Sequence, residues 1–286
     1  MTNTSTDLPS RLKGEMSDTI QSYSTPIVMH SRGPDGEQFA ELKGSGTFVV
    51  SLGTFAILTA AHVVQKLEKE VRENRPFALA PYVQECEHRY LIKSEFLNLK
   101  VVARGEVDAV GPDIGLVGLP EAAIGWIKAS RSFYDLDAAV ADMERPDFLD
   151  ADRYLSVLCG TPDLSKADLP SERGYTGTRQ YAQLCFSCFL GSPSVIDDFN
   201  YYDTEVVYDE GRSLPESFKG VSGGGLWIVP LRQREGFSVK AGKPMLHGVA
   251  FYQTAKEGSL RKIRCHGPAG IYGQVREAIG RLGRGS

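Results

Sequence analysis

The chain of 286 residues lacks any run of about eighteen apolar residues, and its polar N-terminus contains no apolar segment of signal-peptide length. It also lacks a block of lysine and arginine, and its formal net charge is −4 with a pI of about 5.8. General nucleic-acid binders usually carry a basic face or stripe. These absences argue against membrane and nucleic-acid binding, and they predict a cytoplasmic protein.

Cysteine is also scarce, because the five cysteines form an odd and widely spaced set that predicts reduced thiols. Cys185 and Cys188 form a C-x-x-C pattern, but no second such pair and no histidine pair at ligand spacing accompanies it. The surrounding segment YAQLCFSCFL predicts a buried strand, on which residues three apart point to opposite faces. We therefore expect core packing here, no metal site, and no cofactor for the protein.

Short runs of Val, Ile, Phe and Thr, separated by Gly, Pro, Asp and Asn, make up most of the chain and predict a barrel or a sandwich. The expected strands cover residues 25–30, 39–44, 46–60, 98–107, 154–160, the segment around Cys185, 204–208, 225–230 and 247–253. Helices are expected over 63–74 and 120–130 and near the C-terminus, where four apolar residues share one helical face: Ile271, Val275, Ile279 and Leu282.

The same pattern divides the chain into four regions. We expect a flexible arm over residues 1–20, which lack periodicity, and a first β unit over 21–125. An acidic linker with at most one helical turn follows over 126–153, and a second β unit over 154–286 ends in a helix.

A serine lies inside a glycine cluster in FKGVSGGGLW, positions 218–227. Glycine reaches backbone angles that are closed to other residues, so such a cluster marks a tight turn or a backbone close to a ligand. Ser222 is therefore either a nucleophile or a plain loop residue before the apolar run at 226–229. The segment alone does not decide between the two.

Two further motifs contain residue types that a nucleophilic serine needs. In ILTAAHVV, positions 57–64, a strand ends and a helical turn begins at His62, where a lone histidine is usually structural. In VGPDIGLVGL, positions 110–119, Asp113 precedes a short strand, where a turn or capping aspartate is the ordinary explanation. Acyl transfer by serine requires a base, a carboxylate that orients it, and backbone N–H donors for the oxyanion. The combination therefore favours this chemistry more than any one motif does.

Together, TAAHV, DIGL and GVSGG resemble the histidine, aspartate and serine motifs of trypsin-like serine proteases, in the order of that family. The resemblance runs from about residue 25 to 284 and extends to YLSVLCG, HGVAFYQ and the C-terminal GPAGIYGQVREAIGRL. It implies an all-β, chymotrypsin-type fold with two six-stranded antiparallel β-barrels and a C-terminal helix. His62 and Asp113 would lie in the first barrel and Ser222 in the second.

The resemblance also implies a role for each motif residue. Ser222 would be the nucleophile, His62 the general base and then acid, and Asp113 the orienting carboxylate, while the N–H groups of Gly220 and Ser222 would form an oxyanion hole. Substrate-binding residues implied in the same way are Glu216, Ser217, Phe251, Tyr252, Gln253 and Gly270.

Glu216 matches the floor of the family's primary pocket, Gly270 the glycine that keeps the pocket wall open, and Phe251 to Gln253 the edge that pairs with an extended substrate. A carboxylate at the floor predicts cleavage after Lys or Arg, because an unmatched buried charge is costly. Alternatively, Glu216 is solvated or is neutralised by Lys219, and Gln253 blocks deep entry.

Two departures from the family narrow this expectation. Val221 stands where zymogen-type members carry an aspartate, so activation by N-terminal clipping is not expected. Phe218 stands where secreted members carry a cysteine, and the chain is similar to intracellular bacterial branches.

We expect a serine endopeptidase that acts on a protein or peptide substrate, such as one cognate intracellular protein, and that can have a regulatory partner. Two alternatives stay open: a pseudoprotease that binds peptides or serves as a scaffold, and a different acyl-transfer hydrolase such as an esterase.

Overall fold

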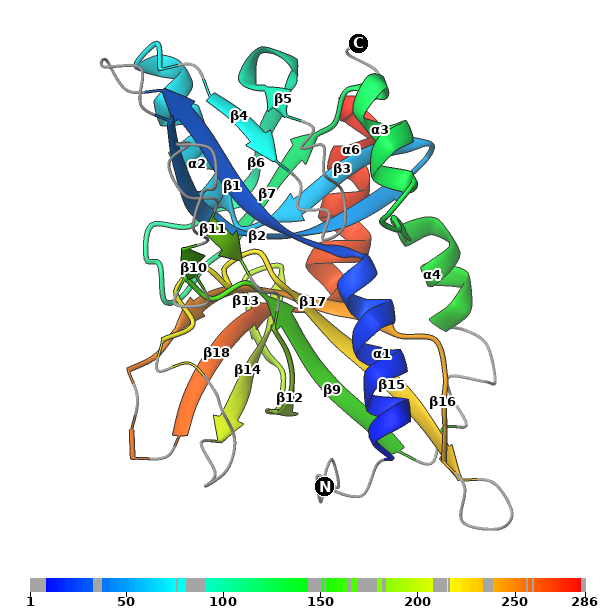
Figure 1. Cartoon of the computed structure of the whole chain (residues 1–286). Helices are drawn as coiled ribbons and strands as arrows, with labels where there is room; N and C mark the ends of the chain where they lie inside the picture. Colours follow the sequence, from blue (N-terminus) through cyan, green and yellow to red (C-terminus); the bar gives the residue numbers. More distant parts are fainter. Residues whose placement is uncertain are drawn as a thin grey trace.

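The computed structural model describes two β-sheet units, one above the other in Figure 1. The described residues are 9–283 except 33–37, 76, 81–90, 144–150, 152, 164–165, 169–178, 182–183, 208–214, 216, 234–238, 256 and 259. Both sheets are almost wholly antiparallel, and this arrangement is compatible with a chymotrypsin-like fold. No helix within the described ranges is both long enough and apolar enough to cross a bilayer.

The first unit is an open half-barrel with the strand order β5-β4-β1-β2-β3-β7-β6, and β8 pairs in parallel with β2. A closed six-stranded barrel was expected, but no pairing joins β5 to β6 among the residues that the structure describes. A two-residue β5 offers too few backbone groups to complete a barrel. The strands are β1 (Ser24–Arg32), β2 (Gln38–Ser51), β3 (Thr54–Thr59), β4 (Phe77–Ala80), β5 (Ile92–Lys93), β6 (Asn98–Arg104), β7 (Asp113–Gly118) and β8 (Tyr134–Asp135).

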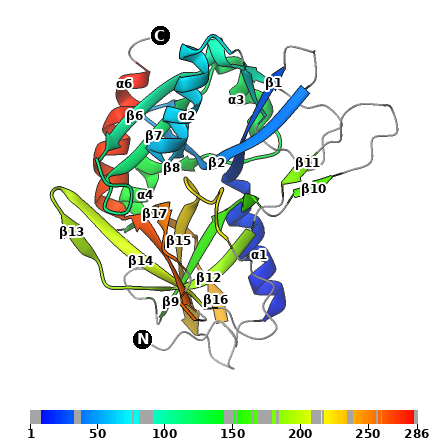
Figure 2. The ribbon, with the colours of Figure 1, turned by 90° about the vertical axis from the view of Figure 1, so that its left-hand side faces the viewer.

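The second unit is a closed barrel of six antiparallel strands, as expected. Its order is β12-β9-β15-β17-β18-β14, and β12 closes the ring by pairing with β14 at Phe189↔Glu205 and Leu190↔Thr204. Figure 2 shows β13 and β14 projecting from the barrel as a hairpin. The strands are β9 (Arg153–Gly160), β12 (Leu184–Leu190), β13 (Ser194–Ile196), β14 (Phe199–Val207), β15 (Gly225–Gln233), β16 (Val239–Ala241), β17 (Met245–Gln253) and β18 (Leu260–His266), with a separate pair β10 (Lys166–Asp168) and β11 (Arg179–Tyr181).

A helix, α1 (Ser10–Ser22), occupies most of the segment that was expected to be a flexible arm, so that expectation is wrong for residues 10–20. Met16 and Ile20 are buried in the core, and the ring of Tyr23 stacks on Trp227 with a centroid distance of 5.3 Å. The spacing of Leu12, Met16 and Ile20 is the helical period that the polar composition obscured.

The remaining helices largely follow the sequence pattern. The expected linker contains β8 and α4 rather than at most one helical turn, and Leu136 and Ala139 of α4 are buried. The expected C-terminal helix is present as a π-helical segment followed by an α-helix. The bounds are α2 (Ala61–Arg72), η2 (Ser94–Phe96), α3 (Glu121–Lys128), α4 (Leu136–Met143), η4 (Gly270–Val275) and α6 (Arg276–Leu282).

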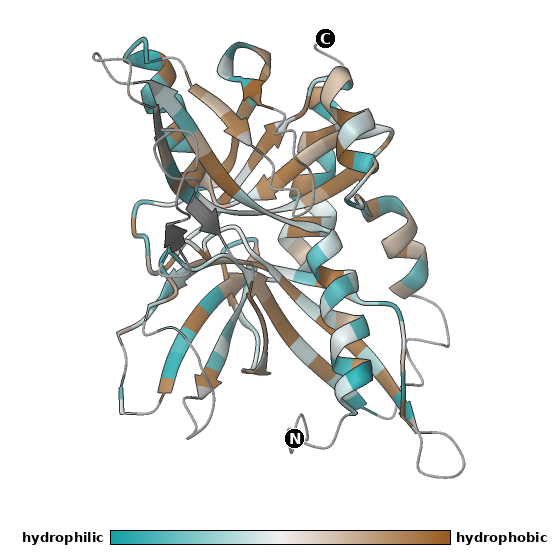
Figure 3. Ribbon diagram, viewed as in Figure 1, coloured by the Kyte–Doolittle hydropathy of each residue, from teal (hydrophilic) through white to brown (hydrophobic). Residues whose placement is uncertain are grey.

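One apolar core joins the two units. Val49 and Leu116 of the first unit belong to the same buried cluster as Trp227, Val229 and Leu246 of the second. Figure 3 shows apolar segments along the strands of both units. Of the C-x-x-C pair, Cys188 is buried as expected, and Cys185 is partly buried and packs against the core. Burial of this shared surface holds the two units together.

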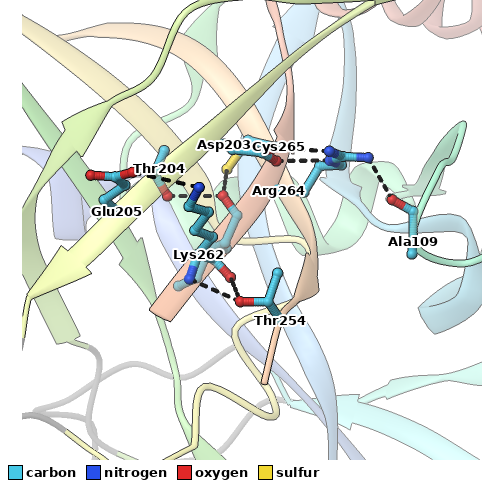
Figure 4. Close-up of polar contacts among 9 residues, drawn as sticks. Ala109, Asp203, Thr204, Glu205, Thr254, Lys262, Arg264 and Cys265 are labelled. Atoms are coloured by element: carbon cyan, nitrogen blue, oxygen red, sulfur yellow. Dashed lines mark hydrogen bonds and ion pairs between the residues drawn. The ribbon is translucent and has the colours of Figure 1, made fainter. Parts of the chain in front are cut away.

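A polar link supplements the core, and Figure 4 shows it on β14 and β18. The guanidinium of Arg264 binds both carboxylate oxygens of Asp203 at 2.7 and 2.9 Å. Its third nitrogen donates to the carbonyl oxygen of Ala109 at 2.8 Å, in the loop of the first unit that leads to Asp113. Arg264 therefore ties the last barrel strand to that loop.

Replacing Arg264 tests this link. We expect Arg264→Ala to lower the free energy of unfolding by about 1–3 kcal/mol, because charge-assisted hydrogen bonds to two elements are lost. Urea denaturation would measure it. The matched control is Arg281→Ala, which removes an exposed i,i+4 pair with Glu277 and should change stability by less than about 0.5 kcal/mol. Equal effects of the two substitutions would contradict the link.

Candidate active site

His62 lies in the first turn of α2, directly after β3. Ala60 has an extended backbone and ends the strand segment, and α2 begins at Ala61. Both alanines are fully buried, so the helix packs closely on the sheet and leaves the histidine at its edge. This local strand-to-helix change is the one that the sequence predicts.

Asp113, the first residue of β7, binds His62 through both carboxylate oxygens. Oδ2 is 2.7 Å from Nδ1 of His62, and Oδ1 accepts the backbone N–H of His62 at 2.9 Å. An ionised carboxylate only accepts hydrogen bonds, so Nδ1 carries the proton and Nε2 is the basic nitrogen of the neutral ring. The expected pairing of these two residues is therefore present in the structure.

The charge of Asp113 is stabilised although its side chain is 2% exposed. Burial alone would raise the pKa of Asp113, but the hydrogen bonds and charge of His62 and the charge of Arg104 outweigh it, and the pKa lies below its ordinary value. Nη1 of Arg104 is 2.8 Å from Oδ2. Asp113 is therefore a carboxylate at neutral pH.

A second histidine, His266 at the end of β18, holds the backbone of Asp113. The N–H of Asp113 donates to Nε2 of His266 at 2.8 Å. Burial lowers the pKa of His266 to about 4, so the ring is neutral and can accept this hydrogen bond. Sequence reasoning missed both His266 and Arg104, because nothing in their local segments marks them.

The turn around Ser222 depends on two glycines with positive φ, 96° at Gly220 and 91° at Gly223. A Cβ at Gly220 would lie 2.6 Å from the carbonyl oxygen of Thr161, and one at Gly223 would overlap the backbone of Ser45. Only glycine fits both positions. The GVSGG motif is thus a structural requirement of this turn.

Ser45 of β2 makes four hydrogen bonds, and two of them hold the Ser222 turn from the first unit. Its N–H donates to the carbonyl of Ser222 at 2.8 Å, and its hydroxyl donates to the carbonyl of Gly220 at 2.8 Å. The same hydroxyl accepts the N–H of Thr161 at 2.8 Å, and its carbonyl accepts the hydroxyl of Thr59 at 2.7 Å. Ser45 is 1% exposed, so water cannot replace these bonds.

The structure brings His62, Asp113 and Ser222 together around one cavity of about 490 Å³. Gly220 and Ser222 line it too, and the amide of neither residue donates a hydrogen bond to any residue that the structure describes. Within the same described part, the Ser222 hydroxyl makes no hydrogen bond to His62. Such contacts are often long before substrate binds.

Only some of the expected substrate-binding residues line the cavity. Phe251, Tyr252 and Gln253 at the end of β17 line the cavity. Oε1 of Gln253 accepts the N–H of Phe218 at 2.9 Å, and its amide nitrogen is 3.4 Å from the hydroxyl of Ser217, so Gln253 braces the Ser222 loop. Ser217 does not line the cavity, and Glu216 lies outside the described residues.

The expectation for Gly270 is wrong, because this residue begins helix η4 and faces Ile114 instead of the cavity. The chain becomes helical at Pro268, so the strand beside β17 is β18. Ile263 of β18 lines the cavity on that side.

Replacing Ser45 tests the link between the units. We expect Ser45→Ala to lower the free energy of unfolding by roughly 2–4 kcal/mol, because the buried N–H of Thr161 and the carbonyl of Gly220 lose their partner. Urea denaturation would show a lower midpoint with an unchanged slope. Ser130→Ala is the control, since Ser130 is exposed. If the free energy of unfolding of Ser45→Ala lies within about 0.5 kcal/mol of that of Ser130→Ala, which is the usual effect of a surface substitution, Ser45 does not link the two units.

The buried histidines predict a pH dependence of stability. Burial lowers the pKa of His266 and of His247 to about 4, below the value of about 6.5 in an unfolded chain. The unfolded state therefore binds protons first as the pH falls from 6.5 to 4, and each histidine should cost about 3 kcal/mol of stability by pH 4. His266→Asn keeps an acceptor for Asp113 and should flatten this dependence. If the stability of His266→Asn falls with pH as steeply as that of the wild type, His266 is not the buried neutral histidine described above.

A scan against models of known protein families and a search of curated proteins found no match to this chain. Any assignment of function therefore rests on the geometry of the site.

Proposed function

We propose that this protein is a serine endopeptidase that hydrolyses peptide bonds of a protein substrate through an acyl-enzyme on Ser222. One observation carries the proposal: His62, held through Nδ1 by buried Asp113, shares a cavity with Ser222 and with two amides that have no described acceptor. These are the base, orienting acid, nucleophile and oxyanion donors of acyl transfer.

The proposed reaction assigns a step to each group. Oγ of Ser222 attacks the carbonyl carbon while Nε2 of His62 takes the hydroxyl proton, and the amides of Gly220 and Ser222 stabilise the oxyanion. The C–N bond then breaks, and His62 gives the proton to the leaving amine. Water attacks the resulting ester with His62 again as base, the bond between the acyl carbon and Oγ breaks, His62 returns the proton to Oγ, and the carboxylic acid product leaves. Asp113 stabilises the imidazolium in both halves.

The end of β17 supports an extended peptide as substrate. Residues 251–253 pair with β18, whereas the pairing of β17 with β15 ends at Val249. The other edge of 251–253 therefore has no partner strand in the described part of the chain, and these residues line the cavity. An open edge of this kind binds a peptide by strand addition. The preference for Lys or Arg before the cut rests on Glu216 and stays a prediction.

The environment of Val221 supports a site that needs no proteolytic maturation. Val221 is buried in an apolar cluster with Leu158, Phe186 and Phe218. An apolar contact, rather than an ion pair to a new N-terminus, therefore holds the turn. The resemblance to intracellular bacterial proteases is the reason for proposing a cytoplasmic protein substrate.

Labelling with a fluorophosphonate probe tests the proposal. We expect one covalent adduct on Ser222, none in Ser222→Ala, and normal labelling in the exposed control Ser130→Ala. Asp113→Asn should label and turn over more slowly at neutral pH, by roughly 10⁴ in kcat, because an amide holds His62 in the wrong tautomer.

The outcomes also separate the alternatives. A folded protein that never labels but binds peptides would favour the pseudoprotease. A labelled protein that cleaves small esters but no member of a peptide library would favour the esterase.

A further inference from the structure

Three lysines line the same cavity as His62 and Ser222. They come from three elements: Lys43 from β2, Lys66 from α2, and Lys219 from the turn before Ser222. Their positions in the chain are far apart, so no local sequence pattern reveals that they share one site. The fold therefore gathers three cationic side chains in one cavity of a protein whose net charge is negative.

The lysines lie on a definite side of Ser222. On one side, β17 binds the turn, since the carbonyl of Ala250 accepts the N–H of Gly223 at 2.7 Å. On the other side lies β2, where Lys43 is two residues before Ser45. Lys66 is one helical turn after His62 on α2. The positive side is thus the β2 and α2 side, opposite the open edge of β17.

The proposed chemistry identifies which half of a substrate reaches that side. His62 delivers the proton to the leaving amine, so the leaving amine must lie beside His62. The residues that follow the cut therefore run over α2 and β2, while the residues before the cut lie along 251–253. The lysines face the residues after the cut.

The positive charge there is only partly compensated. Lys43 is 2.8 Å from a carboxylate oxygen of Glu41 and 3.8 Å from one of Glu70. Lys66 and Lys219 have no ion pair with any residue in the described ranges. Burial, followed by the charges of Lys43 and Lys219, lowers the pKa of Lys66, so the three ammonium groups repel one another.

The acids that line the cavity do not remove this excess. Asp113 and Asp108 both contact Arg104, and Asp113 also binds His62. The backbone N–H of the third acid, Asp163, donates to the carbonyl of Lys219 at 2.6 Å, so Asp163 lies beside Lys219 and its carboxylate offsets at most one of the three ammonium charges. A carboxylate placed among these three ammonium groups gains charge-assisted hydrogen bonds and relieves their repulsion.

We infer that the site is specific for acidic sequences on the leaving-group side: Lys43, Lys66 and Lys219 bind an Asp or Glu side chain of the substrate within the first two residues after the cut. This inference rests on the proposed peptidase function and adds its substrate class. The expected preference for an acidic residue after the cut does not depend on which residue precedes the cut.

A quenched fluorescent peptide library tests it. The positions before the cut are randomised, and the two positions after it are Glu-Glu, Gln-Gln or Lys-Lys. We expect kcat/KM to be about tenfold higher for Glu-Glu than for Gln-Gln, and lower still for Lys-Lys, with the difference shrinking in high salt. In Lys66→Gln and in Lys219→Gln the ratio of Glu-Glu to Gln-Gln should fall towards one.

The control is Lys69→Gln, which lies on the same helix with a 64% exposed side chain close to Glu73, and its ratio should equal that of the wild type. Fluorophosphonate labelling of each variant separates the two proposals. A labelled enzyme that cleaves the three sets equally, that keeps its preference in both lysine variants, or that cleaves no Glu-Glu peptide would overturn this inference alone. An enzyme that neither labels nor cleaves would overturn the proposed function, and this inference with it.

Discussion

The hydrogen bonds of Ser45 are the constraint on which the candidate site depends. His62 and Asp113 belong to the half-barrel, and Ser222 belongs to the closed barrel. The three residues therefore line one cavity only because the two units pack in one defined relative position. The shared apolar core brings the units together but is non-directional. Ser45 of β2 supplies directional contacts, because it donates hydrogen bonds to the carbonyls of Gly220 and Ser222. The amides of Gly220 and Ser222 have no acceptor in the described part of the chain.

The charges of the site are arranged in two separate groups. At the inner end, a buried carboxylate is matched by His62 and Arg104, and its backbone is held by His266. Near the mouth of the cavity, Lys43, Lys66 and Lys219 come from three elements and lie close to Ser222. The Asp113 carboxylate has charged partners within the protein, whereas Lys66 and Lys219 have no ion pair with any residue in the described ranges.

Sequence patterns predicted the features that depend on neighbouring residues and missed those that depend on strand register. TAAHV and GVSGG mark His62 and Ser222 because a strand end and a tight turn are local events. The amphipathic period of α1 was concealed by its polar residues, and the helix is stable because Met16 and Ile20 find a core. His266 reaches Asp113 across 153 positions, and Gly270 was misplaced because the strand beside β17 ends earlier than the motif suggested.

The position of β18 has a consequence for the timing of synthesis. This strand pairs with both β17 and β14, so the second barrel cannot close before residues 260–266 have been made. A nascent chain that already contains His62, Asp113 and Ser222 still lacks the strand that supplies His266 and Arg264. Domains fold as units when their last elements emerge. The topology therefore delays assembly of the candidate site, since Ser222 is synthesised before the strand that completes its surroundings.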